Sequence, residues 1–495
     1  MRQRFEQQNT LGITPVSEIK FPLRSRDELP PVLKGLQHIF VTPELNEKIF
    51  SLLEEKICNG KKPTGRKGMD LWHILVLAVV RHTLDTNWDR LEHIANYDIL
   101  TRQTLGVHVT DFGIEQEEFS YQTIVDNVSL LDATLLQKIN LLVVQHGFDL
   151  LKKKEEEALR LKSDSFVLET NVHFPTDVNL LWDSGRKCLD IVEQLIEPLE
   201  LTGWRKIKHL RRDLKRAYRN CSQQVFHKGK KNEAQIRKSV QHYLQTARLL
   251  KRRMLEILQT SARATTPSTL ALMTELSQYN HYLNHQMNLV ERRLLKGETI
   301  PAEEKIHSIF EPHTEWITKG KMHPSVELGH LLLITTDQYH FIVDYKVLEN
   351  EKDVQQVESL TQRIQTNFPG KSIYSHSFDK GFYSKLNCET LQKTNTKNVI
   401  LPKKGKATKD EKKRESSKTF KALRNAHSAV ESNINMLEHH GLNRCPDKGL
   451  DGYKRYVGIS ILAYNLHILG NHLIAVEKEK EKRLRLQRER YRQAA

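Results

Sequence analysis

Residues 162–170, KSDSFVLET, decide the fold, because this strand-like segment interrupts a chain that is otherwise largely helical. Phe166, Val167 and Leu168 favour strands, and the segment lacks the three- and four-residue apolar spacing of a helix. Helical spacing dominates residues 1–150 before it and residues 187–295 after it. The segment therefore predicts the first strand of a sheet, and this strand carries Asp164.

The remaining strands are predicted after residue 325. Val326–Thr335 and Tyr339–Leu348 read as a hairpin, which is followed by alternating helices and strands. The charged, serine-rich stretch 403–418 is expected to be mobile. The predicted order is strand, strand, strand, helix, strand, helix, strand, helix, with these later elements at 353–367, 372–378, 384–393, 399–401 and 420–440, and a further helix from 453.

This order predicts an α/β ribonuclease-H-like catalytic domain with an all-α N-terminal region and a large helical insertion between its first and second strands. Several other α/β folds share much of the order. A chain of 495 residues is long enough for two to four structural units. We expect a helical N-terminal region for DNA binding or dimerisation (1–155), a catalytic domain (156–475) that is interrupted by a basic helical insertion (178–315), and a charged helical tail (476–495).

Positive charge is concentrated in one part of the chain. The formal net charge is +16, and residues 201–260 alone hold 17 lysines and arginines against three aspartates and glutamates. A solvated helix face is the alternative, but such a face normally mixes both signs, so this segment is predicted to contact phosphates. The basic residues that we predict to bind DNA are Arg211, Arg212, Lys215, Arg216, Lys403, Lys404, Lys406 and Arg424.

Membrane insertion and disulfide bonding are not expected. The longest apolar run, Trp72–Val80, is far shorter than the roughly 20 residues that span a bilayer, and the N-terminus lacks the apolar core of a signal peptide. The five cysteines are scattered without CxxC spacing, which predicts reduced thiols. We therefore expect a cytoplasmic protein that does not act at a membrane.

Three acidic residues are predicted to form a catalytic and metal-binding site. Asp164 lies in the first strand, Asp379 follows the fourth strand where Gly381 would allow a sharp turn, and Glu431 lies on the helix after the fifth strand. Ligands of open α/β sheets gather at the carboxyl ends of strands, and carboxylate oxygens suit Mg²⁺. An aspartate at such a turn is more often a helix cap, so these residues alone leave that alternative open.

Several blocks around these acids resemble a known family. Residues 164–177, DSFVLETNVHFPTD, are similar to the block around the first catalytic aspartate of bacterial insertion-sequence transposases of the DDE class, particularly the ISNCY group. Residues 379–384, DKGFYS, resemble the surroundings of the second aspartate. The resemblance runs from about residue 65 to 475 and also includes KGK at 319–321 with VELG at 326–329, VESNI at 430–434, and GLNR at 441–444.

The resemblance implies a DNA transposase with a mobile element's ends as substrate. The enzyme would hydrolyse the phosphodiester at each end and transfer the freed 3′-hydroxyl into target DNA. Asp164, Asp379 and Glu431 would hold two Mg²⁺ ions, or Mn²⁺. The implied partners are terminal inverted repeats, target DNA and further copies of the chain, as a homodimer or higher oligomer on DNA.

The chain departs from this family at two positions. Related transposases often carry an arginine one helical turn before the glutamate and a lysine two turns after it, where this chain has His427 and Glu438. A neutral histidine is a poorer phosphate contact than arginine, so Arg424 or Lys421 is expected to replace it. The roles of Glu169, Asn171 and His173 stay open; for His173, a role within its own loop is favoured over a DNA contact.

Two other classes of function remain as alternatives. A metal-dependent nuclease would use the same acids without joining strands. A non-catalytic DNA-binding protein would account for the charge and the helices, but it would leave the acid-bearing blocks unexplained.

Overall fold

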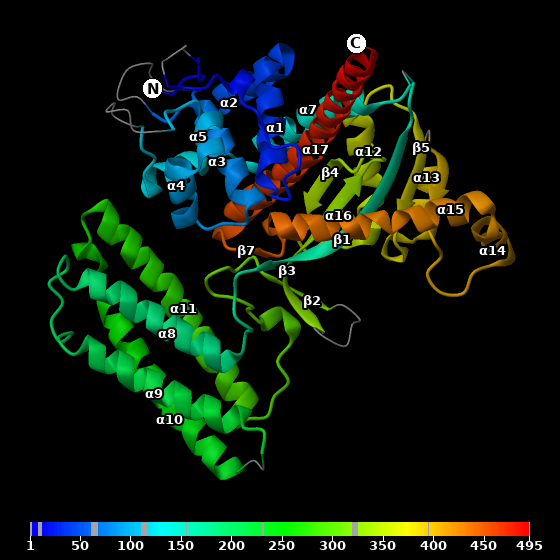
Figure 1. Cartoon of the computed structure of the whole chain (residues 1–495). Coiled ribbons are helices and arrows are strands. Elements are labelled where there is room, and N and C mark those ends of the chain that lie inside the picture. Colours follow the sequence, from blue (N-terminus) through cyan, green and yellow to red (C-terminus); the bar gives the residue numbers. More distant parts are fainter. Residues whose placement is uncertain are drawn as a thin grey trace. The chain divides into compact units, whose positions relative to one another are not determined.

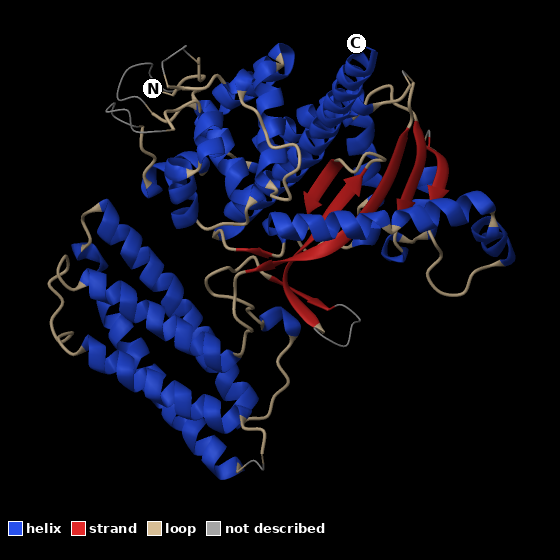
Figure 2. Cartoon of the chain, in the orientation of Figure 1, coloured by secondary structure: helices blue, strands red, loops and turns tan. Residues whose placement is uncertain are grey.

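The computed structural model describes residues 2–7, 12–60, 68–109, 117–154, 156–229, 232–318, 325–394 and 396–494 (Figures 1 and 2). Residues 319–321, quoted above for the family resemblance, lie outside the described residues. The chain divides into two compact units. The first comprises residues 1–171 and 329–495, and the second comprises residues 172–328.

The first unit begins with helices, as the apolar spacing of residues 1–150 predicts. Every residue of α3 (Leu71–Thr83) is buried, so this helix forms the centre of the helical part. Its apolar run lies inside the protein because neighbouring helices cover it on all sides. The other helices of this part are α1 (Leu29–Val41), α2 (Pro43–Ile57), α4 (Trp88–Tyr97), α5 (Ile99–Leu105), α6 (Tyr121–Val128) and α7 (Ala133–Leu151).

The sheet is built around β1 (Leu159–Thr170), the strand predicted from residues 162–170. β1 pairs antiparallel with β3 and parallel with β5, β4 pairs antiparallel with β3, and β6 pairs parallel with β5. The main order is therefore β4-β3-β1-β5-β6, and the hairpin prediction is confirmed. The bounds are β3 (Val326–Thr336), β4 (Ile342–Val347), β5 (Ile373–Phe378) and β6 (Thr396–Ile400), with the short strands β2 (Glu315–Thr318) on β3 and β7 (Arg444–Cys445) on β1.

The helices after the hairpin follow the predicted order, with two differences. The stretch expected to be mobile contains α14, because Thr408 and Glu411 form a reciprocal capping box at its start. The single helix expected at 420–440 is divided at Ser428 into α15 and α16. The bounds are α12 (Val357–Asn367), α13 (Lys385–Gln392), α14 (Lys409–Ser416), α15 (Lys418–His427), α16 (Ala429–Leu437) and α17 (Gly449–Ala494).

Both faces of the sheet are covered. Leu161 and Leu333 belong to the core that includes α1–α7, whereas Phe166 and Leu168 belong to a core with α17. Figure 1 shows α15 and α16 running across the sheet in front of β1. Because α15 contacts β5 and β6 and α16 contacts β1, these helices cover the strand β1 that carries Asp164 and the strand β5 that precedes Asp379.

α17 is the longest helix, and its first half is a core element. A Cβ added at Gly470 would lie 1.7 Å from the carbonyl oxygen of Pro31, so glycine allows α17 to pack directly against α1. Within the described residues, 449–490 are long and apolar enough to cross a membrane, but 67% of the apolar window is buried inside the protein. The bent pair α6 and α7 passes the same length test only when counted as one span. A mostly buried core helix also meets this test, so it is weak support for a membrane span.

The second unit is mainly a bundle of helices with its own core. α8 (Asp177–Leu195), α9 (Ile207–Phe226), α10 (Glu233–Leu258) and α11 (Pro267–Leu295) bury apolar stripes such as Leu214, Tyr243 and Leu283 against one another. Short non-helical segments, which include residues 202–203 and 227–229, separate these helices. The basic residues of α9 and α10 lie mostly on the exposed faces.

Gly329 of β3 allows a close approach that tests the strand pairing. It lies opposite Glu169 of β1, and a Cβ there would lie 1.9 Å from the carbonyl oxygen of Leu168. Gly329→Ala should therefore lower the free energy of unfolding by roughly 1–3 kcal/mol, as measured by urea denaturation. Gly452→Ala is the matched control, because its nearest neighbour would be an ordinary 3.5 Å contact. Equal effects of the two substitutions would contradict the close β1–β3 packing.

Candidate active site

Asp164 and Asp379 occupy neighbouring positions at one edge of the sheet. β1 and β5 run parallel, and Ser163 lies opposite Phe378 in their register. Asp164 directly follows Ser163, and Asp379 directly follows Phe378. Neighbouring strands are spaced about 4.8 Å apart. Since side chains alternate between faces, both carboxylates point away from the side on which Ser163 and Phe378 are buried. The predicted pair is thus brought together by parallel strand pairing.

Glu431 approaches the same edge from a helix. It is an exposed residue in the first turn of α16, the helix that contacts β1. The pKa of Asp164 is raised to about 7, mainly because burial disfavours its charge. The negative charges of Asp379, Asp353 and Glu431 raise this pKa further. The three acids singled out from the sequence therefore share one electrostatic environment.

Asp353 is a fourth carboxylate at this edge that the sequence did not single out. It begins a 3₁₀ turn after β4, and its side chain accepts a hydrogen bond from Ser165 beside Asp164. Burial and the charge of Asp379 raise its pKa, and its buried Oδ1 has no hydrogen-bond partner. No signal in the sequence pointed to it, because Asp353 is 26 residues before Asp379 and belongs to a different loop.

Gly381 contributes to the site in a way that differs from the expectation. The sequence suggested that it provides a sharp turn, but Gly381 is not among the residues with positive φ in the described chain. A Cβ at this position would lie 3.3 Å from Oδ2 of Asp353. The absence of a side chain therefore gives Asp353 room beside the residues that follow Asp379.

His427, which replaces the family's arginine, is a half-buried neutral group at this site. Burial lowers its pKa, although the charges of Asp379 and Glu431 act in the opposite direction. Its Nδ1 lies 3.0 Å from the hydroxyl of Ser377 on β5, and its Nε2 is buried without a hydrogen-bond partner. A neutral imidazole in this position does not supply the positive charge of an arginine, as the sequence comparison had indicated.

The donor set fits hard divalent cations, although the side chains do not form a closed metal site. No group of three or more His, Cys, Asp or Glu in the described ranges is gathered tightly enough to hold a metal ion. Adjacent carboxylates repel one another, and a cation would offset that repulsion. Among the described residues, the buried Oδ1 of Asp353 has no hydrogen-bond partner, and the pKa of Asp164 is raised. A bound divalent cation would interact favourably with both carboxylates.

The structure separates the predicted DNA-binding residues into two groups. Arg211 donates hydrogen bonds to Asp190 and Glu193, and Lys403 bonds to Glu411 and to the hydroxyl of Tyr383, so these two cations are neutralised within the protein. The other predicted residues are exposed: Arg212, Lys215, Arg216, Lys404, Lys406 and Arg424. None of these six forms an ion pair within the part of the chain that the structure describes, so they remain the better predictions for phosphate contacts.

Two residues whose roles were open have partners within the protein. Glu169 accepts a hydrogen bond from Arg444, which ties the end of β1 to β7. His173 lies 3.3 Å from the carboxylate of Asp183 at the start of α8. Both contacts support local structural roles, and for His173 this agrees with the loop role favoured from the sequence.

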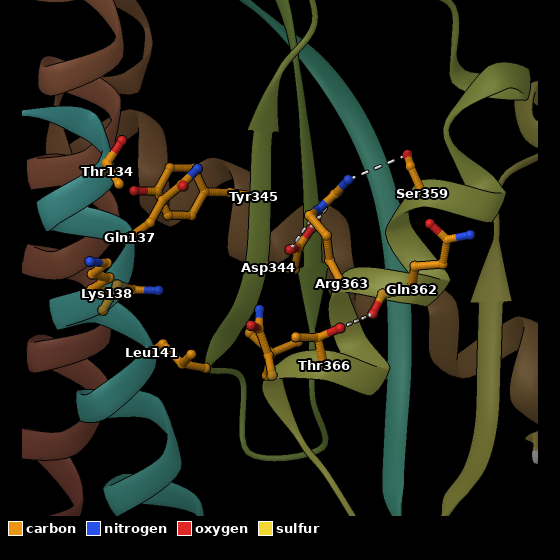
Figure 3. Close-up of a pocket in the computed structure, with 13 residues that line it drawn as sticks. Thr134, Gln137, Lys138, Leu141, Asp344, Tyr345, Ser359, Gln362, Arg363 and Thr366 are labelled. Atoms are coloured by element: carbon orange, nitrogen blue, oxygen red, sulfur yellow. Dashed lines mark hydrogen bonds and ion pairs between the residues drawn. The ribbon is translucent and has the colours of Figure 1, made fainter.

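A cavity of about 560 Å³ lies elsewhere in the first unit, between α7, β4 and α12 (Figure 3). Its main charged group, Arg363, forms a two-pronged ion pair with Asp344 and also donates to Ser359. Asp164, Asp379 and Glu431 do not line this cavity. Its polar groups stabilise the contact between α12 and β4 and are separate from the acidic cluster.

Comparison with known proteins identifies one domain of the chain. Residues 297–466 match the family described as the transposase DDE domain, which confirms the resemblance to insertion-sequence DDE transposases and supports a role in transposition. The matched range includes Asp379, Glu431 and Asp353, whereas Asp164 lies before it. The chain matches no curated protein and no solved structure.

The raised pKa of Asp164 predicts that the ionised carboxyl, the form that would bind a metal ion, lowers the stability of the metal-free fold. Folding favours the protonated form, so the ionised carboxyl destabilises the fold above its unfolded pKa of about 4, with the full cost reached above pH 7. Asp164→Asn should therefore stabilise the metal-free protein at pH 8 by on the order of 2 kcal/mol, and this gain should vanish near pH 4.

Urea unfolding in EDTA across this pH range measures the effect. Glu389→Gln, at an exposed position on α13, is the control and should show no such gain. A gain for Asp164→Asn that is the same at pH 4 and pH 8 would show that the carboxyl is not strained by its surroundings.

Proposed function

We propose that this chain, which carries a transposase DDE domain over residues 297–466, is a DNA transposase of the insertion-sequence type. The observation that carries the proposal is the acidic cluster at the strand ends. Asp164 and Asp379 directly follow Ser163 and Phe378, the last pair of the parallel β1–β5 ladder, and the charge of Glu431 reaches Asp164. Two of these three acids lie within the family match, and the third joins them through the sheet.

We assign the catalytic domain to the ribonuclease-H-like fold. The strand order β4-β3-β1-β5-β6 supports this assignment, with β3 antiparallel to β1 and with β5 and β6 parallel to it. A mixed sheet of this kind collects functional side chains at the carboxyl ends of its parallel strands. The helical unit follows β1 and precedes β3, so it is an insertion in the catalytic domain.

The proposed reaction has two phosphoryl-transfer steps. In the first, water attacks the phosphorus at the element's end, the P–O3′ bond breaks, and a free 3′-hydroxyl and a 5′-phosphate are formed. In the second, that 3′-hydroxyl attacks a phosphorus of target DNA, a new P–O bond forms, and the target strand is left with its own free 3′-hydroxyl. Neither step requires a protein nucleophile or an external energy source.

Asp164, Asp379 and Glu431 would hold Mg²⁺ or Mn²⁺. When bound, two such ions supply activation of the attacking oxygen and stabilisation of the departing one. Asp353 would position this group through its hydrogen bond with Ser165, next to Asp164. His427 would keep the end of α15 against β5 through Ser377, which places Glu431 one helical turn further along. Its neutral form leaves phosphate binding to exposed cations such as Arg424.

The remaining parts of the chain are proposed to bind DNA and other copies of the protein. The exposed cations of α9 and α10 would follow the backbone of the terminal inverted repeats and of target DNA. The N-terminal helices would contribute to repeat recognition and to pairing of subunits, as a dimer or higher oligomer. We place the protein in the cytoplasm, at the nucleoid, because its substrate is chromosomal DNA.

Loss of cleavage without loss of binding tests the catalytic assignment. Asp379→Asn should reduce metal-dependent nicking of inverted-repeat DNA by about 100-fold or more, because it removes a ligand charge at an exposed position. Duplex binding, measured by fluorescence anisotropy in EDTA, should stay nearly unchanged. Asp353→Asn should give a smaller loss, whereas Glu389→Gln should leave both readouts unaltered.

The same assay separates the transposase from its rivals. Pre-cleaved ends with a free 3′-hydroxyl should become joined to a target plasmid. Cleavage without joined product would indicate a nuclease, and binding without any metal-dependent nicking would indicate a non-catalytic DNA-binding protein. Simultaneous loss of cleavage and binding in Asp379→Asn would assign that residue a structural role.

Salt dependence tests the contribution of α9. Replacing Arg212, Lys215 and Arg216 together by glutamine should make the slope of log K against log salt less steep by about 2–3, since each phosphate contact contributes about 0.9. Arg211→Gln is the matched control, because Asp190 and Glu193 already neutralise this guanidinium. An unchanged slope in the triple variant would remove α9 from the DNA interface.

A further inference from the structure

Two large aromatic side chains form an exposed pair in the second unit. Phe174 is 59% exposed and Trp316 is 40% exposed, yet their ring centroids lie only 5.5 Å apart in an edge-to-face arrangement. The ring of His307 lies 5.4 Å from Trp316. A group of exposed aromatic rings usually marks a binding surface. Rings that bind nothing would contribute more to the stability of the fold if they were buried.

The pair is assembled from segments that are far apart in the chain. Phe174 lies in the connection between β1 and α8, two residues before the N-cap of α8 at Thr176. Trp316 lies on β2, which pairs with β3. Each ring is thus attached next to a regular element. Such a surface requires little ordering when a ligand binds, because aromatic side chains have only two rotatable bonds.

The surroundings of the pair favour an anionic ligand. Lys305 is exposed, and its positive charge contributes to the lowered pKa of His307 beside Trp316. Glu304, the neighbouring acid, is neutralised by Arg292, and Asp183 pairs with His173. Glu315, next to Trp316, also has an interaction partner. The second unit as a whole has 26 lysines and arginines against 17 aspartates and glutamates.

Exposed aromatic rings beside an exposed lysine form a combination that suits single-stranded nucleic acid. Every base has a π-face that can stack on an aromatic side chain, and the cations bind the backbone phosphates. An apolar protein partner would cover the rings but would not interact favourably with the neighbouring positive charge of Lys305. The bases of duplex DNA could not stack on Phe174 or Trp316, because the bases of a duplex are already stacked on one another.

We infer that Phe174 and Trp316 form a stacking platform for unpaired bases of the DNA on which the protein acts. The inference rests on the proposed function, since it takes DNA as the substrate. It adds a class of ligand, unpaired nucleotides, and a place for them that lies outside the acidic cluster. In the edge-to-face contact the edge of one ring meets a face of the other, so the ring that contributes its edge keeps both of its faces outside this contact.

Base-dependent binding of single strands tests the platform. Full-length protein in EDTA, where no cleavage occurs, is titrated with a twelve-residue oligothymidine and with an abasic strand of equal length and charge. The wild type should bind oligothymidine about 10-fold more tightly. Phe174→Ala combined with Trp316→Ala should abolish this preference and leave binding of the abasic strand unchanged. Trp316→Phe, which keeps a ring, should retain most of it.

Phe226→Ala is the matched control, because Phe226 is a 46% exposed ring of the same unit at the end of α9. Equal binding of both strands by the wild type, or a preference that survives the double substitution, would overturn the inference. Loss of binding to both strands in the double variant would also overturn it, because the rings would then act through the fold or the phosphates.

Cleavage assays with metal keep this result separate from the proposed function. A wild type that cleaves inverted-repeat DNA but shows no preference for bases refutes the platform alone. A wild type that prefers bases but never cleaves refutes the transposase activity and leaves the platform in place.

Discussion

The parallel pairing of β1 with β5 is the constraint on which the site depends. β1 is the only strand of the described sheet that joins the antiparallel side, β3 and β4, to the parallel side, β5 and β6. The ladder between these parallel strands ends at Ser163 and Phe378, so the next residues, Asp164 and Asp379, lie close together although 214 residues separate them. The backbone hydrogen bonds of the ladder hold two like charges at a distance that free carboxylates in water would avoid.

Placing these carboxylates close together and partly out of water costs free energy, and the pKa values of the acids at this edge show this cost. Burial and neighbouring charges raise the pKa of Asp164 and of Asp353, and one oxygen of Asp353 is buried without a partner. The fold offsets the cost through two apolar cores on opposite faces of the sheet and through the close contact of α1 with α17. A strained acidic edge supported by a well-packed scaffold is typical of a site built for a positively charged ligand.

The second unit adds a helical bundle with exposed positive charge to a chain whose acidic cluster lies in the first unit. Its helices have a separate core, so they can be inserted between β1 and β3 without disturbing the sheet register. Much of its positive charge is exposed, while Arg211 is neutralised by acids of α8. In the proposed division of labour, the carboxylates at the edge of the sheet would act on phosphorus, and exposed cations and rings would hold the strand.

The sequence by itself determined most of the order of strands and helices, and it singled out the three acids of the proposed site, because strand and helix periodicities are local and the acid-bearing blocks resemble a known family. Only the tertiary structure decided what lies beside them. Asp353 reaches the site from its own loop, His427 is made neutral by burial, and Lys403 is neutralised by Glu411. Phe174 and Trp316 meet across 142 residues. Spatial proximity and desolvation have no local signature in the chain, so neither could be read from residue order alone.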